Sequence, residues 1–189
     1  MEKLVKRIKD YYPYMNTEKS TLNLLWDVYA FTKSFILLPP ASKINLIISK
    51  KMKRKSGQFK YKLYKDGSHT LSILLSKKLL IDIPENGESL ISTFLHEISH
   101  LSAFYQFLLN KQPLCTDHGY YFQKEMCILN LMYRGLRPIK VYHDYKIEYK
   151  YRVRCKSCKS IVRRVIHKGK LTDKSRHKKC GGQLYYEKI

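Results

Sequence analysis

Two histidines and a glutamate stand at a spacing that suits metal-assisted hydrolysis. Residues 96–100 read His-Glu-Ile-Ser-His, the pattern H-E-x-x-H, within an apolar segment. Residues four apart lie on the same face of an α-helix, so His96 and His100 would offer two imidazoles to one metal ion. A catalytic zinc ion usually takes three protein ligands and keeps one position for water. Glu97 would act as the general base toward that water, which is the chemistry of a zinc hydrolase, most often a peptidase.

A third ligand is expected downstream, where residues 117–122 read Asp-His-Gly-Tyr-Tyr-Phe. We expect Asp117 to cap a second helix, which would place His118 and Phe122 on one face. His118 would then complete a three-histidine zinc site, and the alternative is a lone surface histidine at the start of a helix. Cys115 precedes this segment, but three nitrogens and water satisfy zinc without it.

A second group of metal ligands lies near the C-terminus. Cys155 and Cys158 form a C-x-x-C pair, and His177 and Cys180 form an H-x-x-C pair, with 18 residues (159–176) between the pairs. That separation is typical of a zinc ribbon. Three thiolates and one imidazole close a tetrahedron, which predicts a structural zinc ion without an open position. His167 is the alternative to His177 as the fourth ligand.

Together these motifs resemble the SprT-like (Spartan-related) family of zinc metallopeptidases. The resemblance rests on residues 96–100, on His118-Gly119-Tyr120-Tyr121-Phe122 as an H-G-x-x-F/W segment, and on the C-terminal cysteines, and it extends over residues 20–189. It implies an α+β fold, in which a zincin-like metallopeptidase domain with N-terminal helices, a small β-sheet and the metal helix is followed by a zinc ribbon. It also implies two zinc ions, one catalytic and one structural, and proteolysis of DNA-bound or DNA-crosslinked proteins, as in DNA repair.

Length and composition agree with two domains, which we place at residues 1–150 and 151–189. Apolar residues make up 44% of the 189, enough for a packed core. No apolar run approaches the roughly 20 residues that span a bilayer, and the N-terminal sequence lacks the apolar stretch of a secretory signal. We therefore expect a monomer without a membrane partner, located in the cytoplasm or nucleus and not secreted.

The net charge of +22 favours a polyanionic partner. Residues 151–189 hold 13 of the 37 Lys and Arg residues but only 2 of the 15 Asp and Glu residues. Such a basic module suits a phosphate backbone, so we expect DNA to bind through the ribbon. The alternative is that the charge reflects the lysine-rich composition of a biased genome.

The metal helix needs a supporting scaffold, which the apolar periodicity outlines. Helices are predicted from Thr17 to about Leu37 and from Glu88 to about Asn110. Lys43–Ser49 is predicted to be a strand, and two further strands should form a hairpin around Asp66-Gly67. By resemblance, Leu71–Ser76 would be a sheet edge that holds substrate as an added strand, and a buried strand is the alternative.

Two other functions stay open at the level of the sequence. The chain could be a non-catalytic DNA- or RNA-binding protein, or a general zinc peptidase without a DNA role. Glu97 argues against the first, because a purely structural metal site needs no general base. Cys127, within the second helix, is expected to belong to the core.

Overall fold

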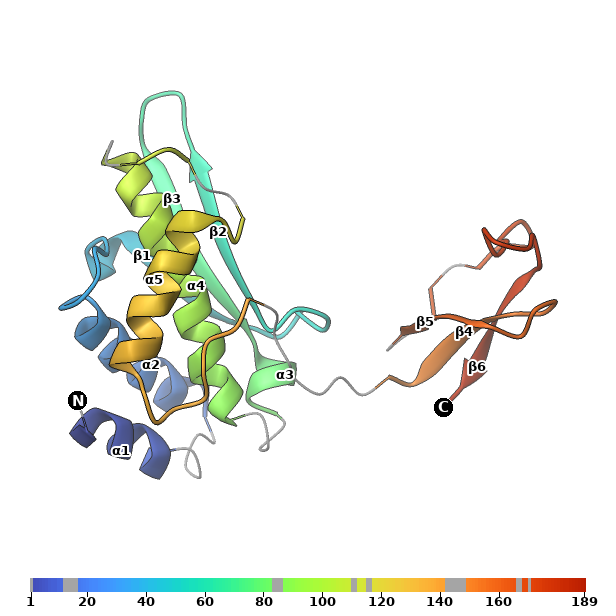
Figure 1. Ribbon diagram of the computed structural model, residues 1–189, viewed down its shortest axis with the longest axis horizontal. Helices are drawn as coiled ribbons and strands as arrows, with labels where there is room; N and C mark the ends of the chain where they lie inside the picture. The colour runs from blue at the N-terminus through green and yellow to red at the C-terminus, as the bar shows by residue number, and fades with distance from the viewer. Residues whose placement is uncertain are drawn as a thin grey trace. The chain divides into compact units, whose positions relative to one another are not determined.

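The chain folds into a mixed α+β architecture with two small sheets (Figure 1). The structure is a computed structural model, and it describes residues 2–11, 17–82, 87–109, 112–114, 117–141, 149–165, 168–169 and 171–189. These residues divide into two compact units, Met1–Tyr145 and Lys146–Ile189. The first unit contains α1 (Glu2–Tyr11), α2 (Glu18–Thr32), η2 (Ala41–Lys43), β1 (Ile44–Ser49), β2 (Gly57–Leu63), β3 (His69–Ser76), α3 (Lys77–Leu80), α4 (Gly87–Leu108) and α5 (Tyr120–Met132). The second contains β4 (Tyr151–Cys155), β5 (Ile161–Val165) and β6 (Leu184–Lys188).

Helix α2 begins where the sequence predicts and ends earlier. The Thr17 side chain accepts a hydrogen bond of 3.1 Å from the Ser20 amide, which confirms Thr17 as the N-cap. The helix ends at Thr32 rather than near Leu37. Beyond Thr32 the amides of Ser34 and Phe35 bond to carbonyls only three residues back, as in a 3₁₀ turn. The α-helix therefore ends before Pro39 and Pro40.

The first sheet has the strand order β1-β3-β2, with β1 parallel and β2 antiparallel to β3. The prediction that Leu71–Ser76 is an edge strand is therefore wrong. Ile73 has a partner on each side, Leu46 in β1 and Phe59 in β2. The parallel pairing of β1 with β3 places β3 in the centre and leaves β1 and β2 as the edges.

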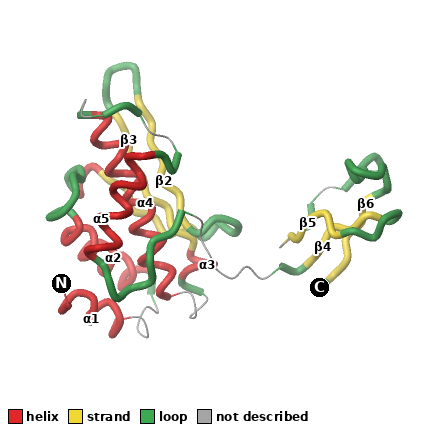
Figure 2. Tube along the Cα trace, in the orientation of Figure 1, coloured by secondary structure: helices red, strands yellow, loops and turns green. Residues whose placement is uncertain are grey.

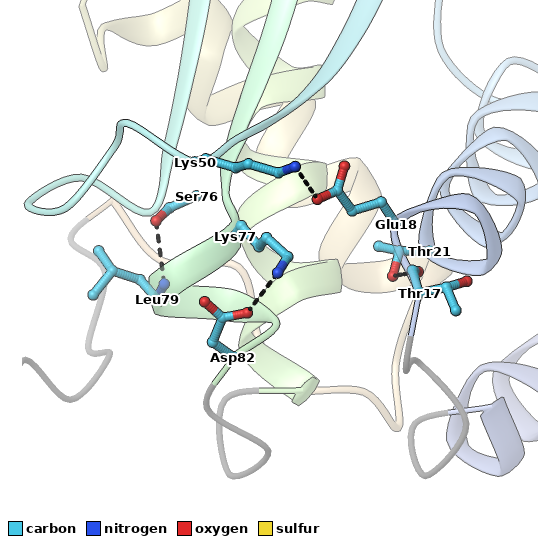
Figure 3. A network of polar contacts seen from close by, with 8 residues as sticks. All are labelled: Thr17, Glu18, Thr21, Lys50, Ser76, Lys77, Leu79 and Asp82. Carbon is cyan, nitrogen blue, oxygen red and sulfur yellow. Dashed lines mark hydrogen bonds and ion pairs between the residues drawn. The ribbon is translucent and has the colours of Figure 1, made fainter.

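The predicted hairpin joins β2 and β3. Gly67 has φ +80°, a conformation that glycine adopts without steric cost, and the Asp66 carboxylate accepts a 2.9 Å bond from the Ser68 amide. At the other end of β3, the Ser76 hydroxyl accepts a 3.1 Å bond from the Leu79 amide and caps the short helix α3 (Figure 3). The chain thus leaves the sheet in a fixed direction toward α4.

Helix α4 packs against β2 and β3 on one side and against α5 on the other, so that the helices lie over one face of the sheet (Figure 2). The core between them consists of fully buried apolar side chains from α4 and β3, namely Leu90, Ile91, Phe94, Leu95, Ile98, Leu101, Leu71, Ile73 and Leu75. Among the described residues, no helix is long and apolar enough to cross a membrane.

Helix α5 corrects one prediction about its side chains. Phe122, Glu125 and Leu129 are its buried residues and define the face that meets α4. Cys127 lies on the other side of the helix and is exposed, so it is not a core residue. The reason is angular, because residues two positions from Glu125 or Leu129 point about 200° away.

The second unit is a three-stranded antiparallel sheet in the order β5-β4-β6. Its small core includes Val153, Cys155 and Val165. Arg152 and Arg154 both pair with Glu187 across β4 and β6. A module with so few buried apolar side chains needs another source of folding free energy, which a bound metal ion can supply.

Candidate functional site

The orientation of the H-E-x-x-H residues follows from the apolar stripe of α4, because burial of that stripe fixes the rotation of the helix about its own axis. Phe94, Leu95 and Ile98 are buried between the helix and its neighbours. His96 and Glu97 are 3% and 4% exposed, so the core also encloses polar groups that require partners.

His118 reaches the two histidines of α4 from the turn before α5. The ligand nitrogens of His96, His100 and His118 lie within 4.8 Å of one another, and His118 Nε2 is 3.1 Å from His96 Nε2. The N-cap of α5 is Gly119, not Asp117 as predicted. Asp117 instead accepts a 2.9 Å bond from the Gly119 amide, which closes the turn that presents His118.

The three nitrogens fit one zinc ion. Zinc binds imidazole nitrogen at 2.0–2.1 Å, so two ligands of a tetrahedral site stand about 3.3 Å apart. The 3.1 Å between His96 and His118 is close to that separation. Three imidazole nitrogens that converge in this way form a ligand set for one cation.

Phe122 forms the floor of this cluster. It is fully buried, and its ring centroid lies 4.9 Å from His96, 4.3 Å from His100 and 4.7 Å from His118. One aromatic ring therefore contacts all three imidazoles, and it sits one helical turn after His118. This contact gives a structural reason for the H-G-x-x-F spacing.

The tautomer of His96 is set by a backbone carbonyl. His96 Nδ1 lies 2.9 Å from the Lys140 oxygen, and a proton on Nδ1 leaves Nε2 free to bind metal. Asn130 of α5 holds the preceding residue, since its side chain makes bonds of 3.1 and 2.8 Å with the carbonyl and amide of Ile139. The segment after α5 is thereby fastened beside the metal helix.

Glu97 is oriented by the edge strand β2. Its Oε2 accepts a 2.6 Å hydrogen bond from the Phe59 amide. Burial raises the pKa of Glu97 to about 7, while the Phe59 amide and the positive charge of Lys55 oppose this rise. Gly57 makes the close approach possible, because a Cβ atom there would lie 2.5 Å from Glu97 Oε1.

The second metal cluster is built from two turns with the same hydrogen bonds. In the first, the Lys159 amide bonds to the Cys155 carbonyl at 3.0 Å and the Cys155 amide to the Ser160 carbonyl at 3.1 Å. In the second, the amides of Gly181 and His177 bond to the carbonyls of His177 and Gly182, both at 2.8 Å. Since the pattern repeats residue for residue, His177 occupies the position that Cys155 has in the first turn.

Positive φ angles complete both turns. Lys159 has φ 58° and Gly181 has φ 69°, and each follows the second ligand of its pair. Gly182 is required for space, because a Cβ there would overlap the Cys155 sulfur.

The four ligand atoms converge within 4.8 Å. His177 Nδ1 lies 3.3 Å from Cys158 Sγ and 3.2 Å from Cys180 Sγ, and Cys155 Sγ lies 3.4 Å from Cys180 Sγ. Hydrogen bonds from the Ser160 hydroxyl and amide, with further help from Cys180, lower the pKa of Cys158 to about 6. A lowered thiol pKa favours the thiolate that binds zinc.

Two residues considered in the sequence analysis, His167 and Cys115, lie outside the described part of the chain. Other residues that contribute to the site were not singled out, namely Asn130, Gly57 and the Phe59 amide. Gly57 and Phe59 contact Glu97 across a long sequence separation, and Asn130 bonds to the backbone of Ile139 nine residues further on. Gly57, just before the predicted hairpin, was the one available signal.

In a comparison with known protein families, residues 24–143 match the model of the SprT-like family. That match spans more than half of the chain and includes the whole three-histidine cluster with Glu97. No curated protein matches the chain. The family is associated with zinc metallopeptidase activity, and both clusters have the composition that zinc prefers. The chain belongs to the SprT-like family.

Proposed function

We propose that this member of the SprT-like family is a zincin-like zinc metallopeptidase that cleaves DNA-bound or DNA-crosslinked proteins. One observation carries the catalytic part. Glu97 is buried beside three convergent histidines and is aimed by the Phe59 amide. Burial of a carboxylate costs desolvation free energy, and a purely structural metal site has no use for it. A hydrolase needs such a carboxylate as its general base.

His96, His100 and His118 would hold the catalytic zinc, and Cys155, Cys158, His177 and Cys180 would hold the structural one. When bound, the catalytic zinc supplies a Lewis acid that polarises a peptide carbonyl and acidifies water. Glu97 takes the proton from the attacking water and returns it to the leaving amine. Its raised pKa, about 7, suits a group that must both accept and release a proton near neutrality.

The DNA-linked part rests on the charge of the ribbon. A groove of about 690 Å³ lies on this module, and its lining includes Arg163, Arg176, Lys178 and Lys179. Four cations around one groove form a site for phosphate, because Lys and Arg neutralise backbone charges and release counterions. Such contacts position a protein on nucleic acid without reading its sequence.

The test is cleavage of a DNA-binding protein by the full chain, with and without DNA, across a salt series. Glu97→Gln keeps the size of the side chain and an oxygen for the Phe59 amide but removes the base. Turnover should fall about 10²–10⁴-fold while zinc content stays the same. Glu18→Gln, an ion-paired surface residue of α2, is the matched control and should cleave like the wild type.

The three readings give different results in this assay. A DNA-linked peptidase is stimulated by DNA at low salt and loses the stimulation as salt rises from roughly 50 to 200 mM. A general peptidase cleaves equally well without DNA. A non-catalytic binding protein cleaves nothing in either condition, which would refute the catalytic proposal. Equal cleavage by the wild type and Glu97→Gln would refute the role of Glu97 as the base.

A further inference from the structure

The excess positive charge is concentrated in two segments of the chain. Residues 151–189 form the ribbon. Residues 43–78 contain 11 of the 37 Lys and Arg residues and 1 of the 15 Asp and Glu residues. The rest of the chain holds 13 basic and 12 acidic residues and is nearly neutral. Because residues 43–78 include all three strands of the first sheet, the catalytic unit has a strongly basic surface of its own.

Strand alternation places part of this charge on the side of the sheet that faces away from the helices. Phe59 and Tyr61 of β2 pack on Phe104 of α4, with ring centroids 5.7 and 4.0 Å away. Successive side chains point to opposite faces, so Lys60 and Lys62 lie on the other face. Both are exposed.

Most of the rest of that face is polar and open to solvent, and it also carries the exposed Ile47 of β1 beside Leu74 of β3. Register places Lys60 beside Ser72 of β3, which in turn pairs with Asn45 of β1, and places Lys62 beside Thr70. Asn45 and Thr70 are exposed, so no described element covers this side of the sheet. Most apolar side chains of the sheet point the other way, into the core.

The loop between β1 and β2 extends the basic surface. Residues 50–55 read Lys-Lys-Met-Lys-Arg-Lys. Lys50 pairs with Glu18 at 3.3 Å, and Lys77, which follows β3 at the same end of the sheet, pairs with Asp82 at 3.2 Å (Figure 3). Asp66 is the one acidic residue within residues 43–78, and it bonds to Ser68 in the hairpin turn. The segment therefore cannot neutralise its own cations.

The edge strand β2 connects this surface with the catalytic residues on the other side of the sheet. Lys55 lies near enough to Glu97 to lower its pKa, and the same strand that presents Lys60 supplies the Phe59 amide to Glu97. A polyanion on this surface would therefore be held across β2 from Glu97, within the same compact unit.

We propose that Lys51, Lys60 and Lys62, together with the exposed polar residues of the sheet, form a second nucleic-acid-binding surface, which we term the lysine face. The proposal rests on the proposed DNA-linked function and adds a site in the catalytic unit itself. Its ligand is the phosphate backbone of a duplex, because lysines spaced about 6.6 Å apart along a strand present point charges in a row. An acidic membrane would also need several apolar anchors, and Ile47 is the one exposed apolar side chain that the described strands present on this face.

The experiment measures binding of the full chain to a short labelled duplex over a salt series. The test variant is Lys51→Gln/Lys60→Gln/Lys62→Gln, and Lys55 is kept because of its proximity to Glu97. The matched control is Lys9→Gln/Lys33→Gln/Lys124→Gln, which removes the same charge from exposed positions on or next to helices. The charge-preserving variant is Lys51→Arg/Lys60→Arg/Lys62→Arg.

We expect the test variant to bind at least 10-fold more weakly at low salt. Its slope of log affinity against log salt should be smaller by about 2–3, since each lost phosphate contact removes about 0.9. The control and the arginine variant should keep the wild-type slope. Cleavage of an unfolded protein without DNA should be unchanged in all of them, which separates this proposal from the peptidase proposal.

Two results would overturn the lysine face. Equal losses in the test and control variants would show that only net charge matters. A test variant that keeps duplex binding but loses binding to phosphatidylserine vesicles would assign the face to anionic membranes. If the wild type cleaves nothing while the slopes still differ as expected, the peptidase proposal fails and the lysine face stands.

Discussion

The side-chain amide of Asn130 binds both polar groups of the Ile139 backbone. Asn130 Nδ2 donates to the Ile139 carbonyl at 3.1 Å, and the Ile139 amide donates to Asn130 Oδ1 at 2.8 Å. The next residue, Lys140, offers its carbonyl to His96 Nδ1 at 2.9 Å. A residue of α5 thus positions His96, a candidate metal ligand of α4, through the segment that follows α5.

Asn130→Ala should therefore weaken zinc binding at the three-histidine site by about 10–100-fold, the usual cost of losing an outer hydrogen bond to a ligand. The measurement is zinc competition with a chelator, which resolves the two sites by their affinities. Zinc in the ribbon should be unaffected. Asn23→Ala removes an exposed asparagine of α2 and serves as the control. Equal zinc affinity in Asn130→Ala and the wild type would contradict the positioning role.

The residues of the two clusters that could hold metal were predictable mainly because the spacing within each pair is local. His96 and His100 are four residues apart on one helix, and the ribbon pairs are each three residues apart, so the backbone geometry alone brings them together. The helix and hairpin signals around Thr17 and Gly67 were local too, and the structure has both.

The strand order could not be predicted in the same way. Whether β3 is central depends on the parallel pairing of Ile44 with Leu71, which no turn between them specifies. The same holds for the bond from Phe59 to Glu97, since only the packed core brings these two segments into contact. Asn130 and Ile139 are closer in the sequence, but no helix or turn rule specifies how the segment after α5 folds back. Asp117 shows the limit of a capping rule, because its side chain closes the turn to Gly119 and does not cap α5, which begins at Tyr120.

His118→Ala should remove one of two zinc ions per chain. His118 would contribute one of three ligands to its site. The ribbon ligands lie in the other compact unit, so the ribbon should keep its zinc ion. Metal content by mass spectrometry, with protein concentration from absorbance, gives the count. His69→Ala, a histidine at the start of β3 outside both clusters, should keep two ions. A wild type with a single zinc, or a variant that keeps both, would refute the assignment of His118.

His177→Ala should loosen the ribbon zinc, and His177→Cys should keep it. The two turns share their backbone bonds, and a thiolate at position 177 can take the place of the Nδ1 ligand. Release of zinc to a colorimetric chelator measures the effect. His167→Ala is the comparison variant, and it should release no more zinc than the wild type. Release from His167→Ala but not from His177→Ala would reverse the choice of ligand.

Gly57→Ala should impair cleavage without loss of zinc. The added Cβ would stand 2.5 Å from Glu97 Oε1 and 2.7 Å from Thr93 Cγ2, so the carboxylate or the edge strand must shift. A displacement of about 1 Å at a reacting group can lower turnover about 100-fold, and we expect a loss of at least 10-fold. Initial rates on an unfolded protein substrate, together with metal content, separate this effect from loss of the site.

The matched control is Gly169→Ala, where the nearest atom to the new Cβ is the Tyr186 hydroxyl at an ordinary 3.4 Å. This variant should cleave like the wild type. If Gly57→Ala instead loses zinc along with activity, the substitution acts through the fold of α4 and not through the position of Glu97. Wild-type turnover in Gly57→Ala would mean that the carboxylate tolerates the shift, and the bond from Phe59 would then not determine its catalytic position.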